Sequence, residues 1–87
     1  MKIKEGFALR EIKGQGIVVA TGPAALHFNG MIRLNEVGTM IWKLLEQGET
    51  ERGIVKRIAE TYGQDEAVVA ADVRELLDQL TGYALEA

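Results

Sequence analysis

The chain has 87 residues, of which 47% are hydrophobic and 26% are charged, the composition of an ordinary globular domain. The length allows one domain with a modest core, and the formal net charge of −3 argues against a nucleic-acid partner. Because the sequence contains neither cysteine nor serine, disulfides, thiolate metal sites and cysteine or serine nucleophiles are excluded.

The N-terminal residues do not have the pattern of a signal peptide, because the charges at Lys2, Lys4 and Glu5 are not followed by an apolar run. No segment approaches the ~20 apolar residues that cross a bilayer. We therefore expect a cytoplasmic protein without a membrane partner.

Three short strands are predicted within residues 6–34. Residues 7–12 alternate roughly between apolar and polar side chains, and residues 17–19 are three β-branched residues in a row, which favours a strand. Residues 31–34 form the third predicted strand, since they follow Asn29-Gly30, a dipeptide typical of hairpin turns.

Three helices are predicted after the strands, at residues 36–47, 51–62 and 66–80. Each predicted helix has apolar residues at spacings of three and four. Each also follows a residue whose side chain can accept hydrogen bonds from the amides of the first turn: Asn35, Thr50 and Asp65. We expect the tail, residues 83–87, to be frayed.

The order of these elements predicts the fold class. Strands first and helices after indicate an α+β fold, with three helices packed on a three-stranded antiparallel sheet in a single domain, residues 1–87. The outline is that of a small winged helix-turn-helix domain. A three-stranded sheet has two edges, and we expect one of them to be available to another chain.

The residues that could carry chemistry are better explained by structure. His27 is the only histidine and is interpreted as an ordinary strand or turn residue. The glycines at 14, 16 and 22 do not have the spacing of a phosphate-binding loop, so they are interpreted as turn residues. Trp42 lies off the apolar stripe of its helix, either at the rim of the core or as a partly exposed anchor in a groove or dimer contact. We expect no catalytic residue, metal site or cofactor.

Charge is unevenly distributed along the chain. Residues 63–87 contain six acidic residues and one basic residue, a net charge of −5, whereas residues 1–34 contain five basic and two acidic residues, a net charge of +3. A winged helix that binds DNA needs Lys and Arg on its third helix, and an acidic helix would be repelled by phosphates. A DNA-binding regulator and a small structural dimerisation module stay as alternatives, but this polarity suits a peptide of mixed charge.

The central and C-terminal motifs resemble a known family. The run L-N-E-x-G-x-x-I-W-x-L-L at residues 34–45 resembles the signature of coenzyme PQQ synthesis protein D (PqqD), and A-E-x-Y-G at residues 59–63 is similar too. The likeness continues through D-x-x-x-V-x-x-D-V-x-x-L-L-x-x-L at residues 65–80. R-E-I-x-G at residues 10–14 and F-N-G at residues 28–30 resemble a branch of the family, so the likeness covers nearly the whole chain.

The resemblance implies a stand-alone recognition element for the leader of a ribosomally synthesised and modified peptide. Such a module presents its peptide to a tailoring enzyme, often a radical S-adenosylmethionine enzyme, in the synthesis of PQQ or of another modified peptide. The leader would add as a strand beside the third strand, in a cleft against the third helix, because an unpaired strand edge is a template for another chain.

The resemblance also implies which residues bind the peptide. They lie on the third strand and on the apolar side of the third helix: Met31, Ile32, Arg33, Leu34, Val69, Val73, Leu76, Leu77 and Leu80. The sequence does not divide the helix residues between core and cleft. We expect Arg33 to point outward, where its charge can meet an acidic leader residue.

Overall fold

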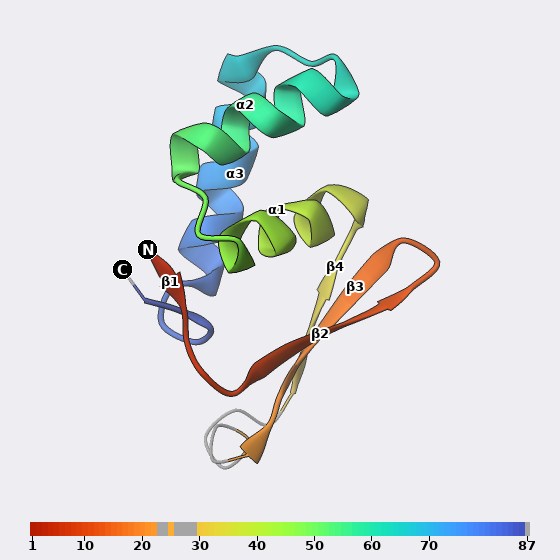
Figure 1. Ribbon diagram of the computed structural model, residues 1–87, viewed down its shortest axis with the longest axis vertical. Helices are drawn as coiled ribbons and strands as arrows, with labels where there is room; N and C mark the ends of the chain where they lie inside the picture. Colours follow the sequence, from red (N-terminus) through yellow and green to blue (C-terminus); the bar gives the residue numbers. More distant parts are fainter. Residues whose placement is uncertain (23–24, 26–29, 87) are drawn as a thin grey trace.

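The computed structural model of the chain describes residues 1–22, 25 and 30–86 (Figure 1). His27 and the first residue of the predicted Asn29-Gly30 turn lie outside the described residues. None of the described helices is both long and apolar enough to cross a membrane.

The three predicted strands form one antiparallel sheet. They are β2 (Phe7–Ile12), β3 (Gln15–Ala20) and β4 (Met31–Leu34), in the order β2-β3-β4. Lys13 and Gly14 connect the first two strands and have positive φ angles of 54° and 80°, as a two-residue hairpin of the primed type requires. The prediction of a three-stranded antiparallel sheet is confirmed.

The three predicted helices follow the sheet. They are α1 (Glu36–Glu46), α2 (Glu51–Tyr62) and α3 (Glu66–Leu80). The predicted caps bind the first-turn amides as expected: Asn35 Oδ1 accepts from Gly38 N at 2.8 Å, Thr50 Oγ1 from Gly53 N at 3.0 Å, and Asp65 Oδ1 from Ala67 N at 2.7 Å. The α+β architecture is confirmed.

The two ends of the described chain pair with each other, which the sequence did not predict. Strand β1 (Lys2–Ile3) pairs antiparallel with β5 (Leu85–Glu86), and Lys4 N donates to Ala84 O at 2.8 Å. Ala84 and Leu85 are only 0% and 2% exposed. The prediction of a frayed tail is therefore wrong, because these two apolar side chains enter the core and hold the tail in place.

Helix α1 is the centre of the packing. It contacts β3 and β4 of the sheet, β1, and α2, so its burial extends beyond one stripe. Trp42 is 0% exposed and belongs to the core, which rules out its interpretation as a partly exposed anchor. The tryptophan is buried off the apolar stripe because α1 is covered on more than one side.

Gly16 of β3 lies close to α1 and to β2. A Cβ atom at this position would come within 2.6 Å of Thr39 Oγ1 on α1 and within 2.7 Å of Leu9 Cδ1 on β2. Thr39 is itself buried, and its hydroxyl donates to Asn35 O at 2.8 Å. The absence of a side chain at Gly16 thus allows the first turns of α1 to lie directly on the sheet.

Candidate functional site

The first component of the site is the free edge of β4. Within the described part of the chain, β4 pairs with β3 on one side and with no strand on the other. Ile32 and Leu34 face the core side of the sheet, and Leu34 is 5% exposed. Met31 and Arg33 face away from the helices, and Met31 is 55% exposed. The edge therefore combines an unpaired backbone with side chains on both faces of the sheet.

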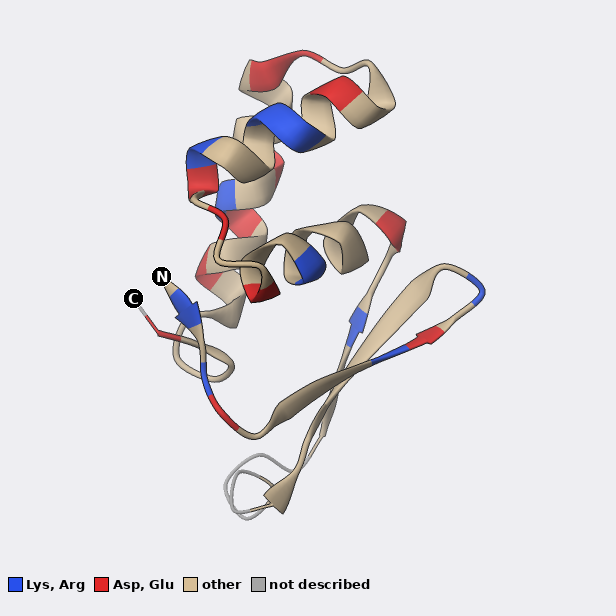
Figure 2. Cartoon of the chain, viewed as in Figure 1, with Lys and Arg blue, Asp and Glu red and all other residues tan. Residues whose placement is uncertain are grey.

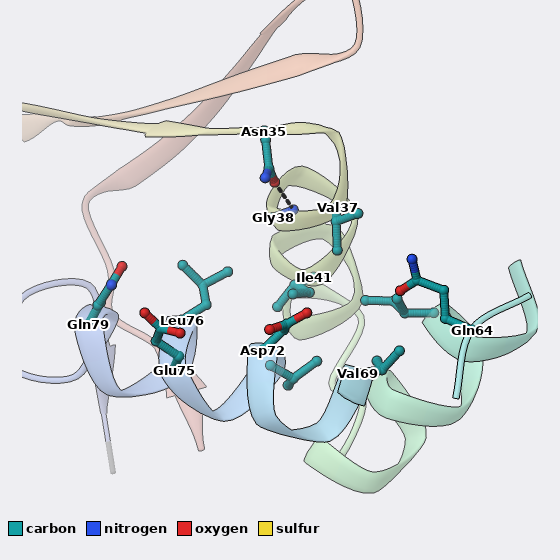
Figure 3. Close-up of a pocket in the computed structure, with 12 residues that line it drawn as sticks. Asn35, Val37, Gly38, Ile41, Gln64, Val69, Asp72, Glu75, Leu76 and Gln79 are labelled. Atoms are coloured by element: carbon teal, nitrogen blue, oxygen red, sulfur yellow. Dashed lines mark hydrogen bonds between the residues drawn. The ribbon is translucent and has the colours of Figure 1, made fainter. Parts of the chain in front are cut away.

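The second component is a groove that begins where β4 ends. It has a volume of about 450 Å³ and lies between the first half of α1 and the exposed face of α3. Figure 3 shows Val37 and Ile41 of α1 and Leu76 of α3 around this space, with Asn35 at the junction with β4. A groove that continues from an open strand edge and has apolar side chains in its lining can receive the side chains of an extended peptide.

The α3 residues that the resemblance implied for peptide binding divide between the core and the groove. Four of them belong to the core, with exposed fractions of 2% or less: Val69, Val73, Leu77 and Leu80. Val69 and Val73 reach the groove only as part of its floor, whereas Leu77 and Leu80 do not border it. Leu76 is partly exposed and lines the groove wall.

Sequence reasoning missed the polar part of this wall. Asp72, Glu75 and Gln79 line the groove together with Leu76. Residues three and four apart share one face of a helix, so the signal was the spacing of Asp72 and Gln79 from Leu76. An acidic helix face is ordinarily explained by contact with solvent, so the sequence alone did not assign these residues to the site.

The charges of the site are not neutralised within the described part of the chain. Asp72 and Glu75 make no ion pair there, because the arginine between them, Arg74, bonds Glu51 at 2.7 Å and Asp78 at 3.0 Å instead. Arg33 of β4 also lacks an acidic partner among these residues. Figure 2 shows basic residues on β4 and at the β2–β3 turn, and residues of both charges on the helices.

A tyrosine joins the end of α2 to the start of α1. Tyr62 Oη donates to Glu36 Oε2 at 3.2 Å. Partial desolvation of the ring raises the pKa of Tyr62, and the hydrogen bond and negative charge of Glu36 raise it further. The phenol is therefore neutral and a hydrogen-bond donor at physiological pH.

Comparison with known proteins identifies the family. The family model for coenzyme PQQ synthesis protein D (PqqD) matches residues 23–85. The chain belongs to the PqqD family. None of the curated proteins compared with this PqqD-family chain matches it significantly.

A solved structure extends the comparison to the whole fold. The PqqD-family chain is similar to TbiB1, solved in complex with the TbiA(β) leader peptide, with a TM-score of 0.85 and 27% sequence identity. The alignment covers 100% of this chain and 98% of the TbiB1 chain. The predicted family and fold class are both confirmed.

The described part of the PqqD-family chain also has a larger cavity, of about 680 Å³, on the other side of α3. It is bordered by the α1–α2 connection and by β5, and its wall contains Arg74, which is already paired with Glu51 and Asp78. The strand that borders this cavity, β5, has only two residues, whereas β4 has four, so the groove beside β4 is the better candidate for an extended chain. The described residues contain no group of three His, Cys, Asp or Glu side chains that could hold a metal ion.

Proposed function

We propose that this PqqD-family protein is a recognition module that holds the leader of a ribosomally synthesised precursor peptide and presents it to a tailoring enzyme. The observation that carries the proposal is the free edge of β4, which runs directly into the groove between α1 and α3. The likeness to TbiB1, whose solved structure contains a leader peptide, supports it.

The binding mode follows from the backbone of β4. In an antiparallel pair, every second residue directs its N–H and C=O to the neighbouring strand, and the residues between direct theirs to the opposite side. Alternate residues of Met31–Leu34 therefore offer both groups to a new strand. These bonds give affinity that depends little on the sequence of the peptide, whereas the groove and Arg33 supply selectivity.

The proposed module performs no chemistry of its own, and the tailoring enzyme supplies the reaction. The family resemblance favours a radical S-adenosylmethionine enzyme, in PQQ synthesis or in the maturation of another peptide. We propose a cytoplasmic location because the precursor is made there on ribosomes. The winged helix-turn-helix outline then serves a peptide, since the exposed carboxylates of Asp72 and Glu75 on α3 would repel a phosphate backbone.

The test is a titration of isotope-labelled protein with a leader peptide encoded beside its gene, followed by backbone amide chemical shifts. We expect the shifts to cluster on Met31–Leu34 and on α3 around Leu76. Shifts confined to α2 or to the Lys13–Gly16 turn would show that strand addition is wrong. Tight, salt-sensitive binding to duplex DNA would favour a regulator, and a homodimer closed through β4 that no peptide opens would favour a dimerisation module.

A charge-reversal variant tests the contribution of the strand side chain. Arg33→Glu should weaken leader binding without loss of stability, because an exposed strand charge contributes little to folding. Arg52→Glu is the matched control, since Arg52 is exposed on α2, away from the groove. Proline at Ile32 would remove a backbone donor, but it would also strain the strand and is the poorer test.

A further inference from the structure

Two hollows lie near the end of β4, one on the helix side of the sheet and one on its outer face. The groove against α3 begins at Asn35, the residue that follows β4, on the side where the sheet packs on the helices. On the opposite face, a hollow of about 380 Å³ is lined by Arg33 of β4, Ile17 of β3, and Ile12 and Lys13 at the β2–β3 turn. Cross-strand register confirms the face, because Ile17 pairs with Arg33 and Ile12 with Gln15.

The two hollows carry opposite charge. Asp72 and Glu75 line the inner groove, and neither forms an ion pair in the part of the chain that the structure describes. Lys13 and Arg33 line the outer hollow, and these cations likewise have no acidic partner among the described residues. Each hollow also has an apolar part, Leu76 in the groove and Ile17 outside.

Strand geometry connects the two hollows to one ligand. Successive side chains of a strand point to opposite faces of the sheet. A peptide added along β4 therefore sends alternate side chains into the acidic groove and into the basic hollow. A basic peptide side chain is attracted by the acidic groove, and an acidic one by the basic hollow. A peptide charge on the wrong face is repelled by residues of the same sign.

From this placement, and resting on the proposed function, we infer the class of leader that the module selects. The peptide carries apolar or basic side chains at the positions that enter the groove against α3, and acidic side chains at the alternate positions that face Arg33 and Lys13. Selectivity thus depends on how charges alternate along the leader, and its net charge is of little importance.

Two synthetic heptapeptides of identical composition test the inference. Thr-Leu-Glu-Leu-Glu-Lys-Thr places its acids on one face and its base on the other, whereas Thr-Glu-Leu-Lys-Leu-Glu-Thr places all three charges on the same face. Sliding a strand by one residue exchanges its two faces. In one register the first peptide places all three of its charges opposite a hollow of opposite charge, whereas the second peptide places at least one charge against a hollow of like charge in either register. We expect it to bind roughly three- to tenfold more tightly, in a titration followed by β4 amide shifts.

Protein variants test whether each hollow contributes to the preference for the first peptide. Arg33→Glu and Glu75→Lys should each reduce the preference for the first peptide to about twofold or less. The matched controls on the exposed face of α2, Arg52→Glu and Glu60→Lys, should leave it unchanged. If both peptides shift the β4 amides with equal affinity, the inference is wrong and the proposed function stands. If neither peptide shifts the β4 amides and a leader encoded beside the gene shifts only amides of α2, the inference and the proposed function are both wrong.

Discussion

Replacement of Gly16 by alanine tests how closely α1 must lie on the sheet. The new Cβ would lie 2.6 Å from Thr39 Oγ1 and 2.7 Å from Leu9 Cδ1. The leucine methyl is the end of a flexible side chain and can move. Thr39 is β-branched, buried in α1 and bonded to Asn35 O at 2.8 Å, so it cannot move without loss of that bond or a shift of the helix.

The expected cost is that of overpacking a well-filled core, about 1–3 kcal/mol in the free energy of unfolding. In a domain of this size, each kcal/mol lowers the melting temperature by roughly 4–8 °C. Chemical denaturation followed by circular dichroism measures the change. Gly53→Ala is the matched control, because the side chain it meets is the flexible Glu49 and alanine favours the helix.

A double-mutant cycle locates the origin of the cost. Thr39→Ala removes Oγ1 and Cγ2, the two atoms of α1 that the new methyl group would approach. Gly16→Ala should therefore cost about 1 kcal/mol less in that background than in the wild type. If Gly16→Ala changes the unfolding free energy by less than about 0.5 kcal/mol, or by the same amount in both backgrounds, the contact does not set the distance between α1 and the sheet.

Three further predictions concern the tail, the tyrosine and the helix cap. Leu85→Ala should lower the unfolding free energy by about 2–5 kcal/mol in denaturant titrations, because Leu85 is 2% exposed in the core; a change below about 1 kcal/mol would mean that the tail is not anchored. In a Tyr83→Phe background, ultraviolet titration should show Tyr62 ionising above its ordinary pKa of 10.0, and Glu36→Gln should bring the value down. Since the folded pKa of Tyr62 is raised, its contribution to stability is complete below the unfolded pKa and is lost as pH rises through the folded pKa. Asn35→Ala should cost about 1 kcal/mol by removing the bond to the first turn of α1, and calorimetry should also show weaker leader binding, because Asn35 lines the groove.

Local signals were sufficient for the helices and for most of the sheet. Asn35, Thr50 and Asp65 each cap the helix that they were predicted to begin. Capping and periodicity act over a few residues, so a sequence contains them directly. The open edge of the sheet could be expected as well, because three strands cannot close on themselves.

Features that depend on distant contacts were not predictable in the same way. Strand β1 pairs with β5 across almost the whole length of the chain, and strands of two residues have no period to detect. The burial of Trp42 depends on the elements that cover α1 on more than one side. The division of the α3 residues between the core and the groove depends on where the other helices pack against α3. The charged wall of the groove, Asp72 and Glu75, looks like any solvated helix face until β4 is placed beside it.

The pairing of β1 with β5 places the first and the last strand of the fold side by side. Lys2 lies opposite Glu86, so the two connections leave about 5 Å apart, the spacing of neighbouring strands. Figure 1 shows this point near the C-terminal end of α1, whereas β4 enters at the other end of that helix. A surface loop of an enzyme can accept such a unit with little change to its own backbone. If the protein binds a leader as proposed, the groove of such an inserted unit would stay open, and the bound leader would reach the host's active site at a high effective concentration.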